Sequence, residues 1–377
     1  MPWQECSRMD RRLEFVRLAE ASGTPFTTLC AGFGISPKTG YKWLTRYAEE
    51  GVAGLADRSR RPQTSPHRTP DAVVAALAEV VAAHPAWGGR KLHAVLVARG
   101  IAGVPAPSTI TAIIQREGLR PPVQPGTHPV TRFEAETPND RWQLDFMGPR
   151  PLRTGRVIPL TLLDDHSRYA LGLEAVPAQT RATVQAVLAA CFERYGLPSE
   201  ILTDNGPPWG SSHPRTRTQL EVWLMQLGIT VTYGRPLHPQ TQGKIERFHR
   251  TIQLEVFAGP LWPDRPAAQS AFDAFRHSSN HDRPHEALDL QPPDRRYQRS
   301  SRVWTGELPP LEYADDALVR IVTPKGIIRV YGHTLYVGEA FQRLPVGLIP
   351  TATDGVYRLL FANQQLRTVD LRQHDQP

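Results

Sequence analysis

The chain opens with apolar residues that recur at helical spacing among charged ones. Between residues 9 and 34 this pattern predicts two short helices, and Ser36 followed by Pro37 has the composition of the start of a third. Along this third helix, basic side chains recur on one face at i, i+4 and i+8: Lys38, Lys42 and Arg46. Residues 1–53 are therefore expected to form a helix-turn-helix domain whose third helix enters the DNA major groove. A three-helix bundle with a solvated basic face is the alternative.

Two stretches without apolar periodicity interrupt the amino-terminal part of the chain. Residues 54–70 combine proline, serine and arginine, as a linker does, and carry a basic cluster that either follows a phosphate backbone or is simply solvated: Arg58, Arg60 and Arg61. Helical periodicity returns over residues 71–120, which predicts a second helix-turn-helix domain with a weaker charge signal. Residues 121–137 are proline-rich and predict an extended connector.

In the middle of the chain the hydrophobic period changes from that of helices to that of strands. Within residues 138–290, three strand-like stretches are followed by an alternation of helices and strands. The predicted strands are 142–146, 157–163, 169–173, 201–203 and 230–233, and the predicted helices are 181–194, 218–227 and 241–256. This order predicts an α/β sheet with helices on its faces, in which chemistry gathers at the ends of strands.

The last part of the chain returns to short strands separated by turns. Residues 291–316 are proline-rich and are expected to be a linker, and residues 317–377 are expected to form a small all-β barrel. Basic side chains are placed to line one face of this barrel: Arg320, Arg329, Arg358 and Arg367. Because acidic residues balance them, contact with DNA and contact between subunits are both open roles for the domain.

Charge and cysteine content narrow the class of protein. The formal net charge is +7 over 377 residues, and the basic excess falls in residues 1–70 and 141–260. Nucleic acid is the natural partner of such arginine-rich segments, and an ordinary solubilising surface is the plain alternative. Three cysteines without a Cys-x-x-Cys pair exclude a disulfide framework and a cysteine zinc site. The most apolar run, residues 72–83, is about half as long as a membrane span, so we expect a cytosolic protein of two to four domains.

Three acidic residues stand in settings that distinguish them from solvated charges. Asp145 lies within a predicted strand, Asp204 follows a short strand and precedes Asn-Gly, and Glu246 lies in a basic, glycine-containing helix start. Taken alone, each has a purely structural explanation: a hydrogen-bonded aspartate near a strand end, a hairpin turn, and a surface salt bridge to Arg250. Burying Asp145 within a strand is costly unless its carboxylate is paired or bound to metal. We predict that the three acids form one site because they occur together, in this order, within the motifs described next.

Four motifs surround these acids: Trp142-Gln-Leu-Asp145, Leu163-Asp-Asp-His-Ser-Arg-Tyr169, Thr203-Asp-Asn-Gly206 and His238-Pro-Gln-Thr-Gln-Gly-Lys-Ile-Glu-Arg-Phe248. They closely resemble those of DDE transposases and retroviral-type integrases of the ribonuclease H-like superfamily. The flanking helix-turn-helix units are similar to those of bacterial insertion-sequence transposases with an integrase core. The step of 42 residues from Asp204 to Glu246 is wider than in retroviral integrases, and their zinc-binding His/Cys module is absent.

The resemblance implies a mechanism and a set of partners. Asp145, Asp204 and Glu246 would be the catalytic, metal-binding acids, and they would hold two Mg²⁺ or Mn²⁺ ions about 4 Å apart. Water would cleave the donor end, and the freed 3′-hydroxyl would attack the target. Candidates to hold DNA near Glu246 are Lys244, Arg250 and Gln253. The implied partners are double-stranded DNA, as element ends and as target, and further copies of the chain, in the nucleoid of a bacterial cytoplasm.

Other functions stay open on the sequence. A non-catalytic DNA-binding regulator derived from a transposase would keep the fold without the chemistry, and a ribonuclease H would have no use for helix-turn-helix domains. Trp209 is either a base-stacking side chain or part of the core. Asp164 and Asp165 are expected to be structural, because Asp-His-Ser is a turn composition.

Overall fold

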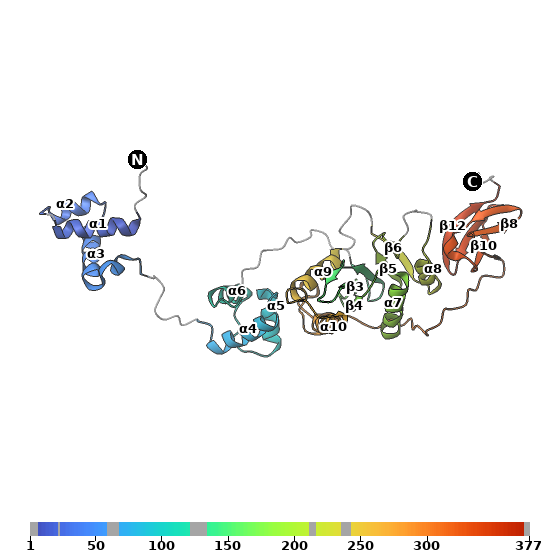
Figure 1. The fold of residues 1–377 in the computed structure, drawn as a ribbon, viewed down its shortest axis with the longest axis horizontal. Helices are drawn as coiled ribbons and strands as arrows, with labels where there is room; N and C mark the ends of the chain where they lie inside the picture. The colour runs from blue at the N-terminus through green and yellow to red at the C-terminus, as the bar shows by residue number, and fades with distance from the viewer. Residues whose placement is uncertain are drawn as a thin grey trace. The chain divides into compact units, whose positions relative to one another are not determined.

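The structure is a computed structural model, which describes residues 7–21, 23–58, 68–120, 134–210, 216–234 and 243–372. The chain forms two compact units, Met1–Arg68 and Thr69–Pro377 (Figure 1). None of the helices within the described ranges has the length and apolar character that crossing a membrane requires.

The first unit contains three helices, as the periodicity predicts. They are α1 (Arg8–Ala21), α2 (Phe26–Gly32) and α3 (Pro37–Glu50), followed by a short 3₁₀ helix, η1 (Gly51–Leu55). The predicted start of α3 is confirmed, because the Ser36 side chain accepts a hydrogen bond of 3.2 Å from the Thr39 amide. A small core holds the helices together by burying Phe15, Val16, Cys30, Trp43 and Leu55.

The second unit begins with three more helices, α4 (Asp71–Ala83), α5 (Gly89–Ala98) and α6 (Pro107–Arg116). One face of α6 packs Ile110 and Ile113 against the core that includes Trp87. Helices α5 and α6 approach closely at Gly89, where a Cβ would lie 2.3 Å from the Pro107 carbonyl oxygen. This approach requires glycine, which has no Cβ.

The central part of the second unit is a six-stranded sheet. Its strands are β1 (Arg141–Phe146), β2 (Arg150–Pro151), β3 (Arg156–Asp164), β4 (Ala170–Val176), β5 (Glu200–Thr203) and β6 (Thr230–Tyr233). The strand order is β2-β3-β1-β5-β6, with β4 paired to β3. Strand β1 is antiparallel to β3 but parallel to β5, and β5 is parallel to β6. The predicted α/β architecture is therefore confirmed.

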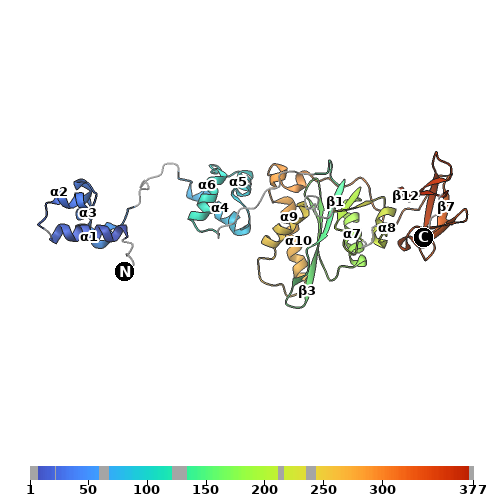
Figure 2. The same ribbon diagram turned by 90° about the horizontal axis from the view of Figure 1, so that it is seen from above.

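Helices cover both faces of this sheet (Figure 2). Helices α7 (Arg181–Tyr195) and α8 (Gln219–Gln226) pack on the face that carries Leu144. Helices α9 (Gly243–Glu255) and α10 (Arg265–His281) pack on the opposite face. Because side chains alternate along a strand, β1 sends Leu144 and Phe146 into the first layer and presents Asp145 to α9.

The C-terminal segment is all-β, as predicted, but its described strands do not close into the predicted barrel. Strands β7 (Leu318–Ile321), β10 (Pro345–Pro350), β11 (Val356–Phe361) and β12 (Gln364–Asp370) form an open antiparallel sheet in the order β12-β11-β10-β7. A separate hairpin consists of β8 (Ile327–Val330) and β9 (His333–Tyr336), which pair only with each other.

The passage from residue 291 to 316 and the C-terminal sheet both contact the central sheet unit. Tyr297 and Trp304 pack against the core under α7, and the Arg302 guanidinium donates a hydrogen bond of 2.8 Å to the Leu227 carbonyl oxygen. The C-terminal core includes Met225 of α8. The proposed domain boundaries stay predictions, although the passage before the C-terminal sheet is attached through side chains.

Gly40 tests the packing of the first unit. A Cβ at this position would lie 2.7 Å from Cys30 Sγ and 2.9 Å from the rings of Phe15 and Phe26. Overpacking of this kind is expected to cost about 1–3 kcal/mol, so Gly40→Ala should accelerate hydrogen exchange at the α3 amides. Gly32→Ala is the control, because no atom lies within 4 Å of its Cβ position. Equal protection of α3 in both variants would contradict this packing.

Candidate active site

Asp145 lies near the end of β1, on the face that α9 covers. Its Oδ1 accepts a hydrogen bond of 2.8 Å from the Phe146 amide, and its Oδ2 lies 3.8 Å from His249 Nδ1. Burial raises the pKa of Asp145 to about 6, and the negative charges of Asp204 and Glu246 add to this rise while the Phe146 amide opposes it. Asp145 therefore lies near enough to Asp204 and to Glu246 for their charges to act on it.

Asp204 follows β5, which runs parallel to β1, so the two aspartates lie at the same edge of the sheet. The indole N–H of Trp209 and the amide of Gly206 both donate hydrogen bonds to Asp204 Oδ1. Trp209 is 3% exposed, and its ring stacks on Phe146 with centroids 4.9 Å apart. Of the two roles open to Trp209, the structure shows the core role. The buried ring joins the loop after β5 to the end of β1.

Glu246 lies in the first turn of α9 and is exposed. The helix is held against the sheet layer by Phe248 and Ile252, which belong to a buried cluster shared with α10. Within the described residues Glu246 makes no ion pair with Arg250, so a surface salt bridge does not account for this acid.

A buried polar network joins β1 to the beginning of α9. The Gln143 side chain donates a hydrogen bond of 2.6 Å to Asp165 Oδ1 and accepts one of 3.1 Å from the Ile245 amide. The Lys244 ammonium contacts the Asp165 carboxylate and donates to the Asp165 carbonyl oxygen at 3.2 Å. Lys244, a predicted DNA contact, is thus paired inside the protein. Sequence reasoning missed this role because the partners are far apart along the chain.

The three acids carry the kind of donor atom that a divalent metal ion prefers. Among the side chains that the structure describes, no group of three or more from histidine, cysteine, aspartate and glutamate lies close enough together to hold a metal ion. Three carboxylates from β1, the loop after β5 and α9 nevertheless supply the hard oxygen donors that Mg²⁺ and Mn²⁺ prefer. Burial is the main cause of the raised pKa of Asp145, and the negative charges of Asp204 and Glu246 add to it, so a bound cation would favour the ionised carboxylate.

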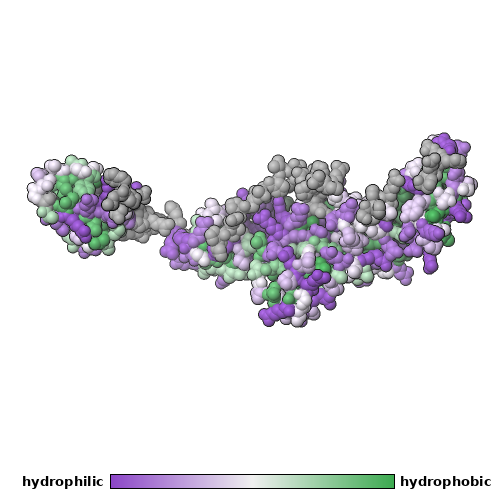
Figure 3. Space-filling model, turned by 45° about the horizontal axis from the view of Figure 1, so that its top comes forward, coloured by the Kyte–Doolittle hydropathy of each residue, from purple (hydrophilic) through white to green (hydrophobic). Residues whose placement is uncertain are grey.

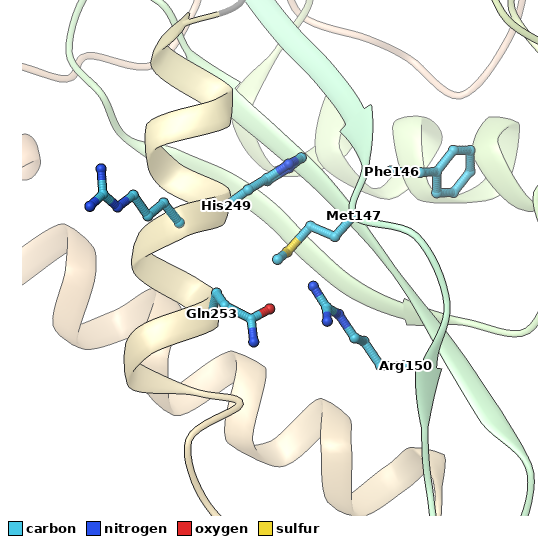
Figure 4. A pocket seen from close by; sticks show the side chains of 6 residues that line it. Phe146, Met147, Arg150, His249 and Gln253 are labelled. Carbon is cyan, nitrogen blue, oxygen red and sulfur yellow. The ribbon is translucent and has the colours of Figure 1, made fainter. Parts of the chain in front are cut away.

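Beside Asp145, a cavity of about 370 Å³ opens between α9 and the chain that leaves β1 (Figure 4). Its lining consists of Phe146, Met147, Arg150, His249, Arg250 and Gln253. Figure 4 shows His249 and Gln253 extending from α9 toward Met147 and Arg150. Burial, assisted by the positive charge of Arg150, lowers the pKa of His249 to about 4, so its imidazole is neutral at neutral pH.

Of the four polar residues that line this cavity, two were predicted from the sequence as functional residues and two were not. Arg250 and Gln253 were candidate DNA contacts, and both line the cavity. His249 stands three residues after Glu246 and four before Gln253, so helical spacing alone was a usable signal for it. Arg150 lies on the two-residue strand β2, which no sequence pattern indicated.

The basic residues predicted to bind DNA in the first unit lie on or after α3. Lys38 is exposed, and the charged groups of Lys42 and Arg46 lie 4.5 and 5.3 Å from the Trp43 ring centroid. Arg58 pairs with a glutamate at the end of α3. Outside the described residues lie Arg60, Arg61 and the His238–Gln242 part of the last motif. Contact of these residues with DNA stays a prediction.

Comparison with protein families defines the class to which this fold and site belong. Residues 135–239 and 227–293 match two family models, each described as an integrase core domain. Residues 11–63 match a helix-turn-helix domain, and residues 39–114 match a homeodomain-like domain. The central part of the chain is therefore an integrase core domain, and the part before it contains helix-turn-helix domains.

The carboxy-terminal match concerns a third domain type. Residues 317–377 match the C-terminal domain of IS481 family transposases. The chain thus combines helix-turn-helix domains, an integrase core domain and a C-terminal domain of the kind found in IS481 family transposases.

Curated relatives come from insertion elements and retroviruses. The chain is 26% identical over 251 residues to an uncharacterized 39.2 kDa protein of insertion element IS476 from Xanthomonas euvesicatoria, covering 64% of this chain and 69% of that protein. It is 26% identical over 156 residues to a 31.7 kDa protein of insertion element IS407 from Burkholderia multivorans, covering 41% of this chain and 54% of that protein. A match to the Gag-Pol polyprotein of Feline leukemia virus is 28% identical over 125 residues and covers 33% of this chain but only 7% of the polyprotein.

Solved structures similar to the chain are retroviral integrases. The HTLV-2 integrase catalytic core domain in complex with magnesium matches with a TM-score of 0.33 and 16% identity, covering 44% of this chain and all of that one (100%). A chain in the structure of the simian T-cell lymphotropic virus intasome in complex with PP2A regulatory subunit B56 gamma matches with a TM-score of 0.37 and 15% identity, covering 78% of this chain and 99% of that one. The fold assignment rests on the sheet order and the family matches.

Repulsion between the acids can be measured directly. Asp204→Asn removes one of the negative charges that raise the pKa of Asp145, so this pKa should fall below about 6 in an NMR titration of the Asp145 carboxyl carbon. Glu193→Gln, at an exposed position of α7, is the control and should leave the titration unchanged. If Asp145 titrates identically in wild type and Asp204→Asn, the two acids do not share a site.

Proposed function

We propose that this chain binds the ends of a mobile DNA element, cuts a DNA strand there and transfers it into target DNA in a divalent-metal-dependent reaction. One observation carries the proposal: the charges of Asp204 and Glu246 act on the carboxyl of Asp145, although the three come from three separate elements. A fold that only binds DNA gains nothing from holding three like charges together. This favours catalysis over the alternative of a non-catalytic, transposase-derived regulator.

Asp145, Asp204 and Glu246 would hold the two metal ions. Bound Mg²⁺ or Mn²⁺ would activate the attacking oxygen and stabilise the leaving oxygen of an in-line phosphodiester displacement. The chain's own groups orient the acids: the Phe146 amide holds one oxygen of Asp145, and the Trp209 indole holds one oxygen of Asp204. The second carboxylate oxygen of Asp145 and that of Asp204 would then be available to a metal ion.

DNA would approach along the cavity beside Asp145. Arg150 and Arg250 supply positive charge there, and Gln253 supplies an amide that can contact phosphate or a base edge. Arg150 is added to the predicted contacts because it faces α9 across the cavity (Figure 4). The helix-turn-helix domains would recognise the element ends, with Lys38, Lys42 and Arg46 of α3 facing DNA.

Joining two element ends requires more than one active site, so we propose that the chain acts as a multimer. The C-terminal domain exposes apolar side chains suited to contact between subunits: Val319 is 40% exposed, Ile321 68% and Tyr331 68%. Figure 3 shows a largely hydrophilic surface on which hydrophobic side chains form small, scattered patches. The exposed apolar side chains favour assembly over DNA contact as the role of that domain.

The enzyme proposal is tested with the purified chain, a duplex of the element's terminal repeat and Mg²⁺. Wild type should nick and join DNA, and Asp204→Asn should lose about 100-fold or more of this activity while still binding the duplex. Glu193→Gln should retain full activity. Absence of nicking by wild type, or full nicking by Asp204→Asn, would refute the enzyme proposal. Tight DNA binding without detectable divalent-ion binding in calorimetry would favour the regulator.

Lys38 tests the role of α3. If its exposed ammonium neutralises one phosphate, Lys38→Ala should weaken binding to the terminal repeat and lower the slope of log K against log salt by about 1. Arg17→Ala removes an exposed charge from α1 and should leave that slope unchanged. An equal change of slope in both variants would place the DNA elsewhere than on α3.

A further inference from the structure

Glu246 depends on the helix around it for its position. Within the described residues it forms no hydrogen bond and no ion pair, so its carboxylate lies wherever the first turn of α9 carries it. Phe248 and Ile252 hold α9 in the apolar layer, but hydrophobic contact has no direction and leaves rotation and sliding of the helix weakly restrained. Directional bonds to the first turn are therefore what can fix Glu246 relative to Asp145.

Gln143 makes one of these bonds from the strand that carries Asp145. The two residues are separated by one position on β1, so they share a face of the sheet. The side-chain carbonyl of Gln143 accepts a hydrogen bond of 3.1 Å from the Ile245 amide, which is among the first N–H groups of α9 that lack a partner in the helix. Gln143 is 1% exposed, so water does not compete for this bond.

Asp165 and Lys244 make the second connection. The side chain of Asp165 is 3% exposed and that of Lys244 is 17% exposed, and their charged groups are in contact. The Asp165 carboxylate also accepts hydrogen bonds of 2.6 Å from the Gln143 side chain and 2.7 Å from the Ala135 amide. A buried carboxylate requires its partners, so Lys244 is held in place two residues before Glu246.

We propose that Gln143, Asp165 and Lys244 are positioning residues that set the place of Glu246 relative to Asp145, and thereby the geometry that the site offers to a divalent ion. This inference rests on the proposed function. It assigns Lys244 to the acids rather than to DNA. Mg²⁺ demands near-ideal geometry, and loss of a group that orients metal ligands typically weakens metal affinity by about 10- to 100-fold.

The test measures divalent-ion affinity by calorimetry on the full chain without DNA. Gln143→Met keeps the volume of the side chain but removes both hydrogen bonds, and it should weaken Mg²⁺ binding by about 10- to 100-fold. Gln269→Met is the matched control, because Gln269 bridges α10 to β4 in the same way, with hydrogen bonds of 2.7 Å from the Ala175 amide and 3.1 Å to the Leu173 carbonyl oxygen. That bridge lies on the same sheet but does not contact α9, so metal affinity should not change.

A second variant, Lys244→Arg, distinguishes a displaced Glu246 from an unfolded chain. Lys244→Arg keeps the buried charge pair but lengthens the side chain, so the chain should unfold at the wild-type temperature and still bind Mg²⁺ less tightly. Because Lys244 is assigned to the acids and not to DNA, the affinity of Lys244→Arg for duplex DNA in the absence of metal should equal that of wild type. A lower DNA affinity would instead indicate that Lys244 contacts DNA.

The outcomes separate this inference from the function on which it rests. Wild type that neither binds a divalent ion nor nicks DNA overturns the proposed function and this inference together. If wild type binds a divalent ion and nicks DNA, but Gln143→Met and Lys244→Arg bind Mg²⁺ as tightly as Gln269→Met does, then only this inference is overturned. Selective weakening in the first two variants supports it.

Discussion

Everything near the candidate site depends on holding three carboxylates of like charge at one edge of a sheet. Burial of Asp145 opposes its ionisation and raises its pKa, and the negative charges of Asp204 and Glu246 add to this rise. The fold resists the repulsion with apolar layers on both faces of the sheet, which hold β1, β5 and α9 in place regardless of charge. Burial and like charge thus both oppose the ionisation of Asp145, an arrangement that a bound cation would stabilise.

Two kinds of contact divide this task. Apolar packing fixes which elements are neighbours, because Phe248 and Ile252 place α9 over the sheet. Polar contacts then determine how those neighbours are aligned, through Gln143 at the start of α9 and Trp209 after β5. A substitution in the first group would loosen the whole layer, whereas one in the second would shift an acid within an otherwise intact fold.

The sequence allowed most of the fold to be predicted, because the change from helical to strand periodicity is strong between the first and central parts. It also allowed the facing of Asp145 to be predicted, since alternation along β1 leaves only one choice once Leu144 is buried. It did not reveal the pairing of Asp165 with Lys244, 79 residues apart, because a long-range side-chain contact leaves no local pattern. For the same reason, an open C-terminal sheet could not be distinguished from a barrel: strand positions are local, but closure depends on which edges meet.

The stacking of Trp209 on Phe146 has a consequence for how such proteins diverge. The ring fastens Asp204 to the end of β1 within five residues of the acid, before the chain continues toward α8. The position of the acid is therefore independent of the length of the chain that follows. A longer chain between this tryptophan and α8 would leave Asp204 at the end of β1, so the position of this acid is compatible with the long step from Asp204 to Glu246.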